Sequence, residues 1–150
     1  MNLNIRNQFI IRRYRERDFE GIKRLWNETG MNDPERADNE KTILATLKTG
    51  GSLLVMIEKE SGTVCGTSWM SFDGRRIHLH HFGILPPFQG KGLSGILLDE
   101  SLKFVREKGC QVKLEVKQNN AKAISLYKKA GFTCLGDYDV YIIRDIPKID

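Results

Sequence analysis

The sequence predicts a single α/β domain with one mixed sheet, mostly antiparallel and flanked by helices. The chain has 150 residues, a length that suits one domain with its own core. Apolar segments typical of strands alternate with segments in which apolar residues recur at helical spacing. Three strand-like segments follow one another across short turns, which indicates an antiparallel meander, whereas helices separate the later ones. The predicted order is β-α-α-β-β-β-α-β-α-β-β.

The first part of the chain is predicted to form one strand and two helices. The strand covers residues 8–14, and the first helix begins at Asp18 as its N-cap. The apolar residues of this helix at helical spacing are Phe19, Ile22, Leu25 and Trp26. The second helix is predicted over residues 39–48, with Asp38 as its N-cap. Its inner face is predicted to consist of Ile43, Leu44 and Leu47.

The middle of the chain is predicted to form the meander, with strands over residues 53–59, 64–72 and 76–85. The Asp73-Gly74 pair between the second and third strands is a strong hairpin signal. All the histidines of the chain lie in the third strand. Strict alternation would put His78 and His80 on one face of that strand, and His81 on the other.

The last part of the chain is predicted to add two helices and three strands. In order, these are a helix over 93–108, a strand over 111–117, a helix over 120–130, and strands over 132–135 and 138–144. Asn120 is the expected N-cap of the shorter helix. The inward residues of the longer helix are expected to be Ile96, Leu97, Leu102 and Val105. The two final strands are predicted to pair as a hairpin around Gly136-Asp137.

Composition and charge exclude several classes of protein. Hydrophobic residues make up 40% and charged residues 29%, which argues against disorder. We find neither a stretch of roughly 18 apolar residues, as a membrane span needs, nor a signal peptide. The three cysteines are widely spaced and fit neither a disulfide framework nor a zinc motif. We therefore expect a cytoplasmic protein without a metal.

The net charge of +5 favours an anionic partner. The basic residues are distributed along the whole chain instead of forming one arm or tail. A nucleic-acid arm or tail is therefore not indicated. The charge alone does not choose among nucleic acid, anionic lipid, a phosphorylated cofactor and a merely solvated basic surface. We expect no nucleic-acid or membrane partner.

The most informative segment lies between the third meander strand and the long helix: Pro86-Pro87-Phe88-Gln89-Gly90-Lys91-Gly92-Leu93-Ser94-Gly95. Glycines in such a turn let backbone N–H groups approach a ligand closely. The unsatisfied N–H groups and the dipole at a helix start favour an anion. The segment therefore predicts a phosphate-binding turn, with a glycine-rich turn that binds nothing as the alternative.

Two other motifs have to be compared with this segment. Gly90, Gly92 and Gly95 satisfy the G-x-G-x-x-G fingerprint, and Glu115 lies on the next predicted strand, where a ribose-binding acid is expected. An NAD-type dinucleotide-binding protein is therefore an alternative, although that fold needs repeated parallel βαβ units. A Walker A loop is excluded, because Lys91 is followed by Gly92 instead of Ser or Thr.

A second segment, Asn120 to Phe132, is by itself an amphipathic helix in which Tyr127 would be a core aromatic residue. Taken with the turn, it resembles the GNAT superfamily of acyl-CoA-dependent N-acyltransferases. Gln89 to Ser94 resembles the Gln/Arg-x-x-Gly-x-Gly/Ala pyrophosphate loop of that family, with the small residue Ser94 in place of the usual Gly or Ala. The second segment resembles the Asn-x-x-Ala…Leu-Tyr-x-Lys-x-Gly-Phe element at Asn120, Ala123, Leu126, Tyr127, Lys129, Gly131 and Phe132.

The resemblance implies that residues 1–150 form one GNAT-type domain with a pair of splayed strands. These strands would be the predicted ones over 76–85 and 111–117, with the pantetheine of acetyl-CoA between them. Phe82 and Ile84 would meet pantetheine through their backbone groups, and Asn120 is a further contact. The diphosphate would lie on the turn residues Gln89, Gly90, Lys91, Gly92, Leu93 and Ser94.

The implied activity is direct transfer of an acetyl group from acetyl-CoA to a primary amine in a ternary complex. Tyr127 would be the general acid at the leaving thiolate, and the Ile84 N–H would donate to the acyl oxygen. The general base stays open between His80, Glu115 and a water chain. A non-catalytic acyl-CoA sensor is the nonenzymatic alternative.

The acceptor is expected to be a small-molecule or peptide amine. In the family, the first two helices, their loop and the last hairpin commonly shape the acceptor pocket. The corresponding residues here are Trp26, Asn32, Asp33, Glu35, Asp73 and Tyr138. The acidic loop residues would attract a cationic amine. The oligomeric state stays open, with a homodimer among the alternatives.

Overall fold

The computed structural model describes residues 3–147. The chain divides into two compact units, one ending at Lys117 and one beginning at Gln118. No helix among residues 3–147 has both the length and the apolar character of a membrane-spanning segment.

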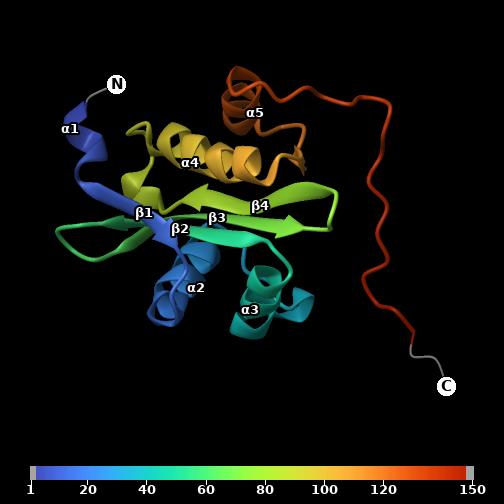
Figure 1. The fold of residues 1–150 in the computed structure, drawn as a ribbon, viewed down its shortest axis with the longest axis horizontal. Coiled ribbons are helices and arrows are strands. Elements are labelled where there is room, and N and C mark those ends of the chain that lie inside the picture. Colours follow the sequence, from blue (N-terminus) through green and yellow to red (C-terminus); the bar gives the residue numbers. More distant parts are fainter. Residues whose placement is uncertain (1–2, 148–150) are drawn as a thin grey trace. The chain divides into compact units, whose positions relative to one another are not determined.

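The first unit is built on a five-stranded sheet in the order β1-β2-β3-β4-β5 (Figure 1). The strands are β1 (Phe9–Arg13), β2 (Ser52–Glu58), β3 (Val64–Phe72), β4 (Arg76–Ile84) and β5 (Gln111–Leu114). The first four strands pair antiparallel, and β5 runs parallel to β4. This confirms the predicted α/β class with a mixed, mostly antiparallel sheet, although β5 ends at Leu114 instead of Lys117.

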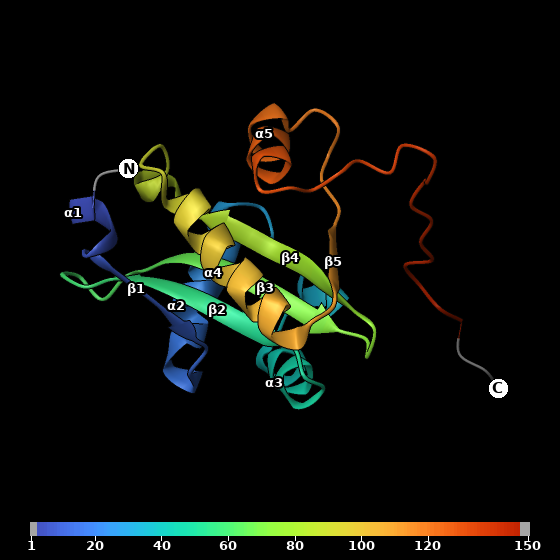
Figure 2. The same cartoon turned by 45° about the horizontal axis from the view of Figure 1, so that its top comes forward.

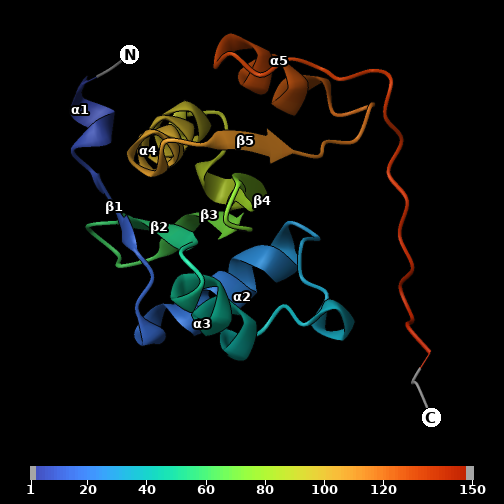
Figure 3. The same cartoon turned by 45° about the vertical axis from the view of Figure 1, so that its right-hand side comes forward.

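Helices lie on both faces of this sheet. They are α1 (Leu3–Arg6), α2 (Phe19–Glu28), α3 (Glu40–Lys48) and α4 (Leu93–Lys108), with short 3₁₀ turns at Glu16–Asp18, Pro34–Arg36 and Pro86–Phe88. The predicted helices correspond to α2, α3 and α4, whereas α1 was not predicted. Figure 1 and Figure 3 show α2 and α3 on one face of the sheet and α4 on the other. Figure 2 shows α4 lying along β3 and β4, which it contacts.

Two stacked indoles form the centre of the core on the α2 and α3 side. The rings of Trp26 and Trp69 are 5.2 Å apart and nearly parallel, and both side chains are buried. The Trp69 indole donates to Thr46 Oγ1 at 3.2 Å. Thr46 is buried and thus belongs to the inner face of α3. The prediction that Leu44 faces inward is wrong, because Leu44 is 53% exposed. A hydroxyl on the inner face satisfies the buried indole N–H, which a leucine cannot do.

The two acidic residues predicted as helix caps have other partners. Asp18 stands at the N-cap position of α2, but its carboxylate accepts hydrogen bonds from Arg12 and from the Arg15 backbone N–H. The prediction for Asp38 is wrong, because Asn39 caps α3 by accepting from the Thr42 N–H at 3.0 Å. The Asp38 side chain is thereby left for a contact with β4.

The inner face of α4 also differs in part from the prediction. Leu102 is half-buried, whereas Ile96, Leu97 and Val105 are buried as expected. Ser101 is buried as well, and its hydroxyl hydrogen-bonds the buried Ser68 hydroxyl on β3 at 2.7 Å. A polar pair thus occupies part of the α4 interface that periodicity assigns to apolar residues.

The second unit contains α5 (Ala121–Lys129). Asn120 caps this helix as predicted, because its Oδ1 accepts from the Ala123 N–H at 3.2 Å. Gly131 adopts a left-handed φ of 103° just beyond the helix end. The Tyr127 ring then meets the Phe132 ring edge-on, with centroids 5.6 Å apart.

The predicted C-terminal hairpin is wrong within the described residues. Residues 132–147 contain no strand, and the turn that the Gly136-Asp137 pair predicts is present as a hydrogen bond from the Tyr138 N–H to the Leu135 carbonyl. The large apolar side chains here are exposed: Leu135, Tyr138, Val140, Tyr141, Ile142, Ile143 and Ile146. High strand propensity produces a strand only where the backbone finds a neighbour, and an isolated two-stranded hairpin is marginal in water.

Candidate active site

The sheet opens between β4 and β5. The parallel pairing of these strands ends at Leu79 and Leu114, whereas β4 continues to Ile84. The two strands therefore part after one short ladder, as the predicted splay requires. The residues of β4 from His80 to Ile84 are left with an edge that β5 does not cover.

The backbone of Ile84 is directed toward this open edge. The Leu85 N–H donates to the Cys65 carbonyl on β3 at 2.7 Å. Because successive backbone groups of a strand point to opposite sides, the N–H and the carbonyl of Ile84 face away from β3. The Gln89 side chain donates to that carbonyl at 2.8 Å. The side chain of the first turn residue is thereby hydrogen-bonded to the last residue of β4.

The glycine turn leads directly into α4. Gly90 and Gly92 have left-handed φ values of 78° and 79°, and Gly92 is the N-cap residue of α4 without a side chain to cap it. Residues 89–92 are exposed. A Cβ atom added at Gly90 or Gly92 would meet no described atom within 4 Å, so the space over the turn is open.

The charge at this turn is positive. The Lys91 ammonium lies 5.5 Å from the centre of the Phe88 ring, on the exposed side of the turn. Leu93 is buried, so it offers a ligand its backbone N–H and not its side chain. An exposed helix start with backbone donors and a lysine suits a diphosphate.

A β-bulge interrupts β4 where the edge becomes open. Three residue steps separate His80 from Gly83 on β4, whereas two separate their partners Trp69 and Thr67 on β3. The extra residue on β4 allows His81 to adopt a left-handed φ of 44°. The Thr67 hydroxyl donates to the His81 carbonyl at 2.8 Å and supports this conformation.

The bulge brings all three histidines together. The rings of His78 and His80 are 5.3 Å apart, and those of His80 and His81 are 5.0 Å apart. The Trp69 ring contacts both His80 and His81. The prediction that His81 faces the other side of the sheet is therefore wrong, because strict alternation does not hold through a bulge.

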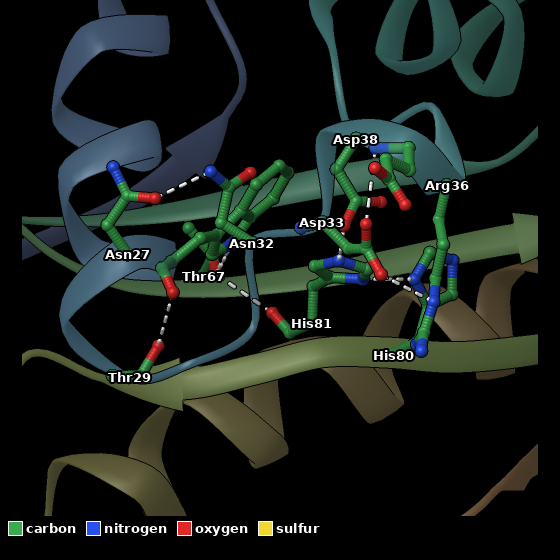
Figure 4. Close-up of polar contacts among 11 residues, drawn as sticks. Asn27, Thr29, Asn32, Asp33, Arg36, Asp38, Thr67, His80 and His81 are labelled. Carbon is green, nitrogen blue, oxygen red and sulfur yellow. Dashed lines mark hydrogen bonds and ion pairs between the residues drawn. The ribbon is translucent and has the colours of Figure 1, made fainter.

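Hydrogen bonds join two of these histidines to the loop before α3. Figure 4 shows His81 between His80 and Asp38. The Nδ1 atoms of His80 and His81 are 2.7 Å apart, and His81 Nε2 is 2.9 Å from Asp38 Oδ2. Asp38 also accepts from the Asp33 backbone N–H at 3.0 Å. The sequence does not indicate this role of Asp38, because a position before a helix predicts a cap.

Burial strongly affects two of the histidines. Burial, followed by the nearby His81 and His78, lowers the pKa of His80 to about 3. Burial and Lys113 lower the pKa of His78, which Glu115 opposes. Both imidazoles are therefore neutral at physiological pH. No group of three or more His, Cys, Asp or Glu side chains within the described residues has an arrangement suited to a metal ion.

The other predicted site residues have varied environments. Glu115 is exposed and follows the last residue of β5. Asn120 and Tyr127 belong to the second unit, where burial raises the pKa of Tyr127. Phe82 is half-buried on the open part of β4. Ser94 is half-buried in the first turn of α4.

The residues predicted to shape an acceptor pocket do not form one group. Trp26 is fully buried beneath His81, so it supports the site from the core. Asp33 holds its own loop through Arg36 and the Glu35 N–H (Figure 4). Asp73 accepts two backbone N–H groups of the β3–β4 turn.

The remaining members of that predicted group differ in exposure. Asn32 is half-buried and donates to Asn27 (Figure 4), and Glu35 is exposed. Tyr138 is 77% exposed within the second unit. The loop between α2 and α3 thus contributes the acidic groups that lie on the histidine side of the sheet.

Comparison with known families identifies the fold. A family model described as the Acetyltransferase (GNAT) family matches residues 9–132, most of the chain. This chain belongs to the GNAT acetyltransferase family. The resemblance inferred from the two motifs is thereby confirmed, and GNAT membership makes the chain an acyl-CoA-dependent N-acetyltransferase.

Solved structures of acetyltransferases are similar along most of their length. A Trypanosoma brucei acetyltransferase has a TM-score of 0.72 and 21% identity, covering 92% of this chain and 99% of that one. An acetyltransferase from Streptococcus agalactiae 2603 has a TM-score of 0.73 and 19% identity, covering 91% and 92%. YncA from Salmonella typhimurium, solved with its cofactor acetyl-CoA, has a TM-score of 0.70 and 25% identity, covering 85% and 80%.

Proposed function

We propose that this GNAT acetyltransferase transfers an acetyl group from acetyl-CoA directly to a primary amine, with both substrates bound at once. The observation that most supports this is the end of β4–β5 pairing at Leu79 and Leu114. It leaves β4 from His80 to Ile84 without a paired strand on that edge, which leads into an open, positively charged glycine turn. The pantetheine arm of CoA is an extended chain with amide groups that leads to a diphosphate. It therefore matches the hydrogen-bonding groups of this edge and the positive charge of the turn.

The proposed cofactor contacts are mainly backbone groups. Phe82 and Ile84 would meet the pantetheine arm through backbone groups along the edge of β4 that β5 does not cover. The diphosphate would be held by the six turn residues Gln89, Gly90, Lys91, Gly92, Leu93 and Ser94. Gly90 and Gly92 suit this role, since their left-handed φ values and open surroundings expose the backbone. Asn120 is a further proposed contact, by resemblance to the family.

The proposed chemistry needs a base, a donor to the acyl oxygen and an acid. Acetyl-CoA, when bound, supplies an acyl group activated as a thioester. The Ile84 N–H is the proposed donor to the acyl oxygen, since backbone alternation directs it to the open edge. Tyr127 is the proposed acid, and burial raises its pKa, which keeps the phenol protonated.

His80 is the proposed base, in preference to Glu115. His80 lies at the residue where β5 stops covering β4, and it is joined to a buried carboxylate through His81. Glu115 is exposed and follows the last residue of β5. A base that accepts a proton beside the open edge becomes positively charged. For His80, that charge can be stabilised through His81 by the Asp38 carboxylate.

The proposed acceptor is a cationic amine, either a small molecule or a peptide amine. The loop between α2 and α3 contributes Asp33 and Glu35, and its Asp38 joins the Asp33 N–H to His81. We also propose that residues 1–150 act as one GNAT domain. The family match supports this, because residues 9–132 include parts of both compact units.

An amine screen with detection of free thiol tests this function. Incubation with acetyl-CoA is expected to release CoA only when a suitable primary amine is present, and mass spectrometry of that amine should show one added acetyl group. Acetyl-CoA binding without turnover on any amine would instead favour a sensor. Calorimetric binding of NAD without binding of CoA would contradict the cofactor assignment.

A further inference from the structure

Three side chains from two distant parts of the chain form one continuous hydrogen-bonded series. His80 and His81 come from β4, and Asp38 comes from the loop before α3 (Figure 4). The side chains of His81 and Asp38 are 18% and 8% exposed, so their contact is largely sheltered from water.

The backbone is strained at both ends of this contact. Among the described residues, Ala37 and His81 are the non-glycine residues with positive φ, at 64° and 44°. One precedes Asp38 and the other is the histidine that Asp38 contacts. Such conformations persist where the surrounding structure determines them, and they gather at functional sites. Here the Thr67 hydroxyl fixes the His81 carbonyl, and the Asp33 N–H fixes the Asp38 carboxylate.

The carboxylate determines where the protons lie. Ionised Asp38 is an acceptor, so its partner His81 Nε2 has to carry a proton. In neutral His81 the lone pair is then on Nδ1, and the 2.7 Å contact requires a proton on His80 Nδ1. The lone pair of His80 is left on Nε2, with the Ser71 hydroxyl at 3.5 Å.

We propose that His80, His81 and Asp38 form a proton relay that deprotonates the acceptor amine. An N–H bond of the protonated amine breaks, its electron pair stays on the amine nitrogen, and the proton binds His80 Nε2. The Nδ1 proton of His80 passes to His81 Nδ1, so His80 is neutral again. His81 becomes an imidazolium beside the Asp38 carboxylate.

This assignment rests on the proposed function, because His80 is the base proposed there. His80 would touch the acceptor, whereas His81 and Asp38 are positioning residues that act through it. The relay explains how a buried imidazole with a pKa of about 3 can act as a base near neutral pH. The positive charge does not stay on His80 but is placed next to a carboxylate.

The charged groups around the cluster of His78, His80 and His81 are unevenly distributed. Asp38 is the carboxylate in contact with the histidines within the described residues, and it faces His81. From β4, His78 and His81 each lower the pKa of His80. From β5 and the residue after it, Lys113 and Glu115 act on His78 in opposite directions. Asp38 is therefore the group expected to decide where a proton on the cluster rests.

Nitrogen-15 NMR of the histidines tests the relay without any acetyl transfer. His80 is expected as the tautomer with its proton on Nδ1, whereas free histidine favours the proton on Nε2. His81 is expected as the tautomer with its proton on Nε2, next to Asp38. A His80 proton on Nε2 in the neutral protein would overturn the proposal.

Two matched variants test the role of the carboxylate. Asp38→Asn keeps an acceptor for His81 but removes the charge that holds a proton on His81 Nε2, so the nitrogen-15 spectrum should lose the single tautomer of His80 and His81. Asp33→Asn lies on the same loop and keeps an Oδ1 acceptor for the Glu35 N–H, so it should leave both tautomers unchanged. Unchanged tautomers in folded Asp38→Asn would overturn the relay.

Kinetics of the wild type and both variants separate the relay from the proposed function. With an amine found in the screen, Asp38→Asn is expected to lower the plateau of kcat about 10- to 100-fold. It should also shift the acid limb to lower pH, with KM for acetyl-CoA unchanged. A loss of kcat without a shift would show a structural role and overturn the relay while the acetyltransferase stands. The expected NMR result in a protein that acetylates no amine would refute the proposed function instead.

Discussion

Gly92 and Gly109 lie at the two ends of α4 in the same left-handed conformation, with φ of 79° and 66°. A Cβ atom at either position would meet no described atom within 4 Å. The two residues therefore share one backbone conformation and the same open surroundings, but they differ in their place in the fold. Gly92 is in the proposed diphosphate turn, and Gly109 is at the opposite end of the helix.

Replacing either glycine with alanine tests the turn. Both Gly92→Ala and Gly109→Ala are expected to lower the free energy of unfolding by about 1–2 kcal/mol, because alanine is strained in this conformation. Gly92→Ala should also weaken acetyl-CoA binding by at least about tenfold, since a methyl group occupies space over the backbone donors. Chemical denaturation and calorimetry measure the two effects. Equal acetyl-CoA affinity in the two folded variants would remove the turn from the cofactor site.

The turn and α4 were predictable because their signals are local. The Gly90-Lys91-Gly92 sequence, an amphipathic helix of 16 residues and a glycine at its end all act within a few residues of one another. The same holds for Asn120 at the start of α5. Short-range chemistry of this kind determines the conformation almost independently of the rest of the chain.

The parts that were predicted wrongly depend on distant partners. His81 changes face because β3 and β4 pair with one extra residue, which alternation within β4 does not show. Asp38 leaves the cap position to Asn39 because His81, far along the chain, offers a hydrogen bond. The segment after Phe132 has strand composition but no strand neighbour within the described residues. Long-range pairing decided each case.

The contact between Arg12 and Asp18 predicts a pH-dependent contribution to stability. Two hydrogen bonds of 2.7 and 2.9 Å join them, and Asp18 is 4% exposed. Asp18→Asn is expected to lower the free energy of unfolding by about 1–3 kcal/mol at neutral pH, because a buried charge-assisted contact is lost. Glu28→Gln, which breaks an exposed ion pair with Arg24, should change it by about 0.5 kcal/mol or less.

The pH dependence of this effect has a definite sign. Burial would raise the pKa of Asp18, but the hydrogen bonds from Arg12 and the Arg15 N–H outweigh it, so the pKa is lowered. The stabilisation is present above the unfolded pKa of about 3.9 and is lost as pH falls through the lower folded value. The stability difference between wild type and Asp18→Asn should therefore shrink below about pH 4. A difference that stays constant between pH 2 and 7 would contradict this assignment.

The choice between the two proposed bases is tested by amide substitutions. His80→Gln removes the proton-accepting nitrogen and is expected to lower kcat about 10²- to 10⁴-fold. Glu115→Gln should change kcat less than about twofold, because the exposed carboxylate has no part in the proposed relay. Steady-state kinetics at saturating acetyl-CoA measure both. A large loss of kcat in Glu115→Gln, with wild-type activity in His80→Gln, would reverse the assignment.

The proposed acid, Tyr127, is tested by removing its hydroxyl group alone. Tyr127→Phe keeps the edge-on contact with Phe132, so the packing of the second unit should be retained. Loss of the acid is expected to lower kcat about 10²- to 10⁴-fold, with little change in acetyl-CoA affinity. Because burial raises the pKa of Tyr127, the alkaline limb of the wild-type profile should lie above the ordinary tyrosine value of about 10. That limb should disappear or shift in Tyr127→Phe.

Tyr138→Phe is the matched control for this prediction, because Tyr138 is 77% exposed in the same unit. It removes a hydroxyl of the same kind at a position outside the proposed acid–base groups. Its kcat and its pH profile should match those of the wild type. If Tyr127→Phe also has wild-type kcat across the pH range on the true acceptor, then the Tyr127 hydroxyl donates no proton in the rate-limiting step. Tyr127 would then be an aromatic packing residue, and the acid would have to be water or another side chain.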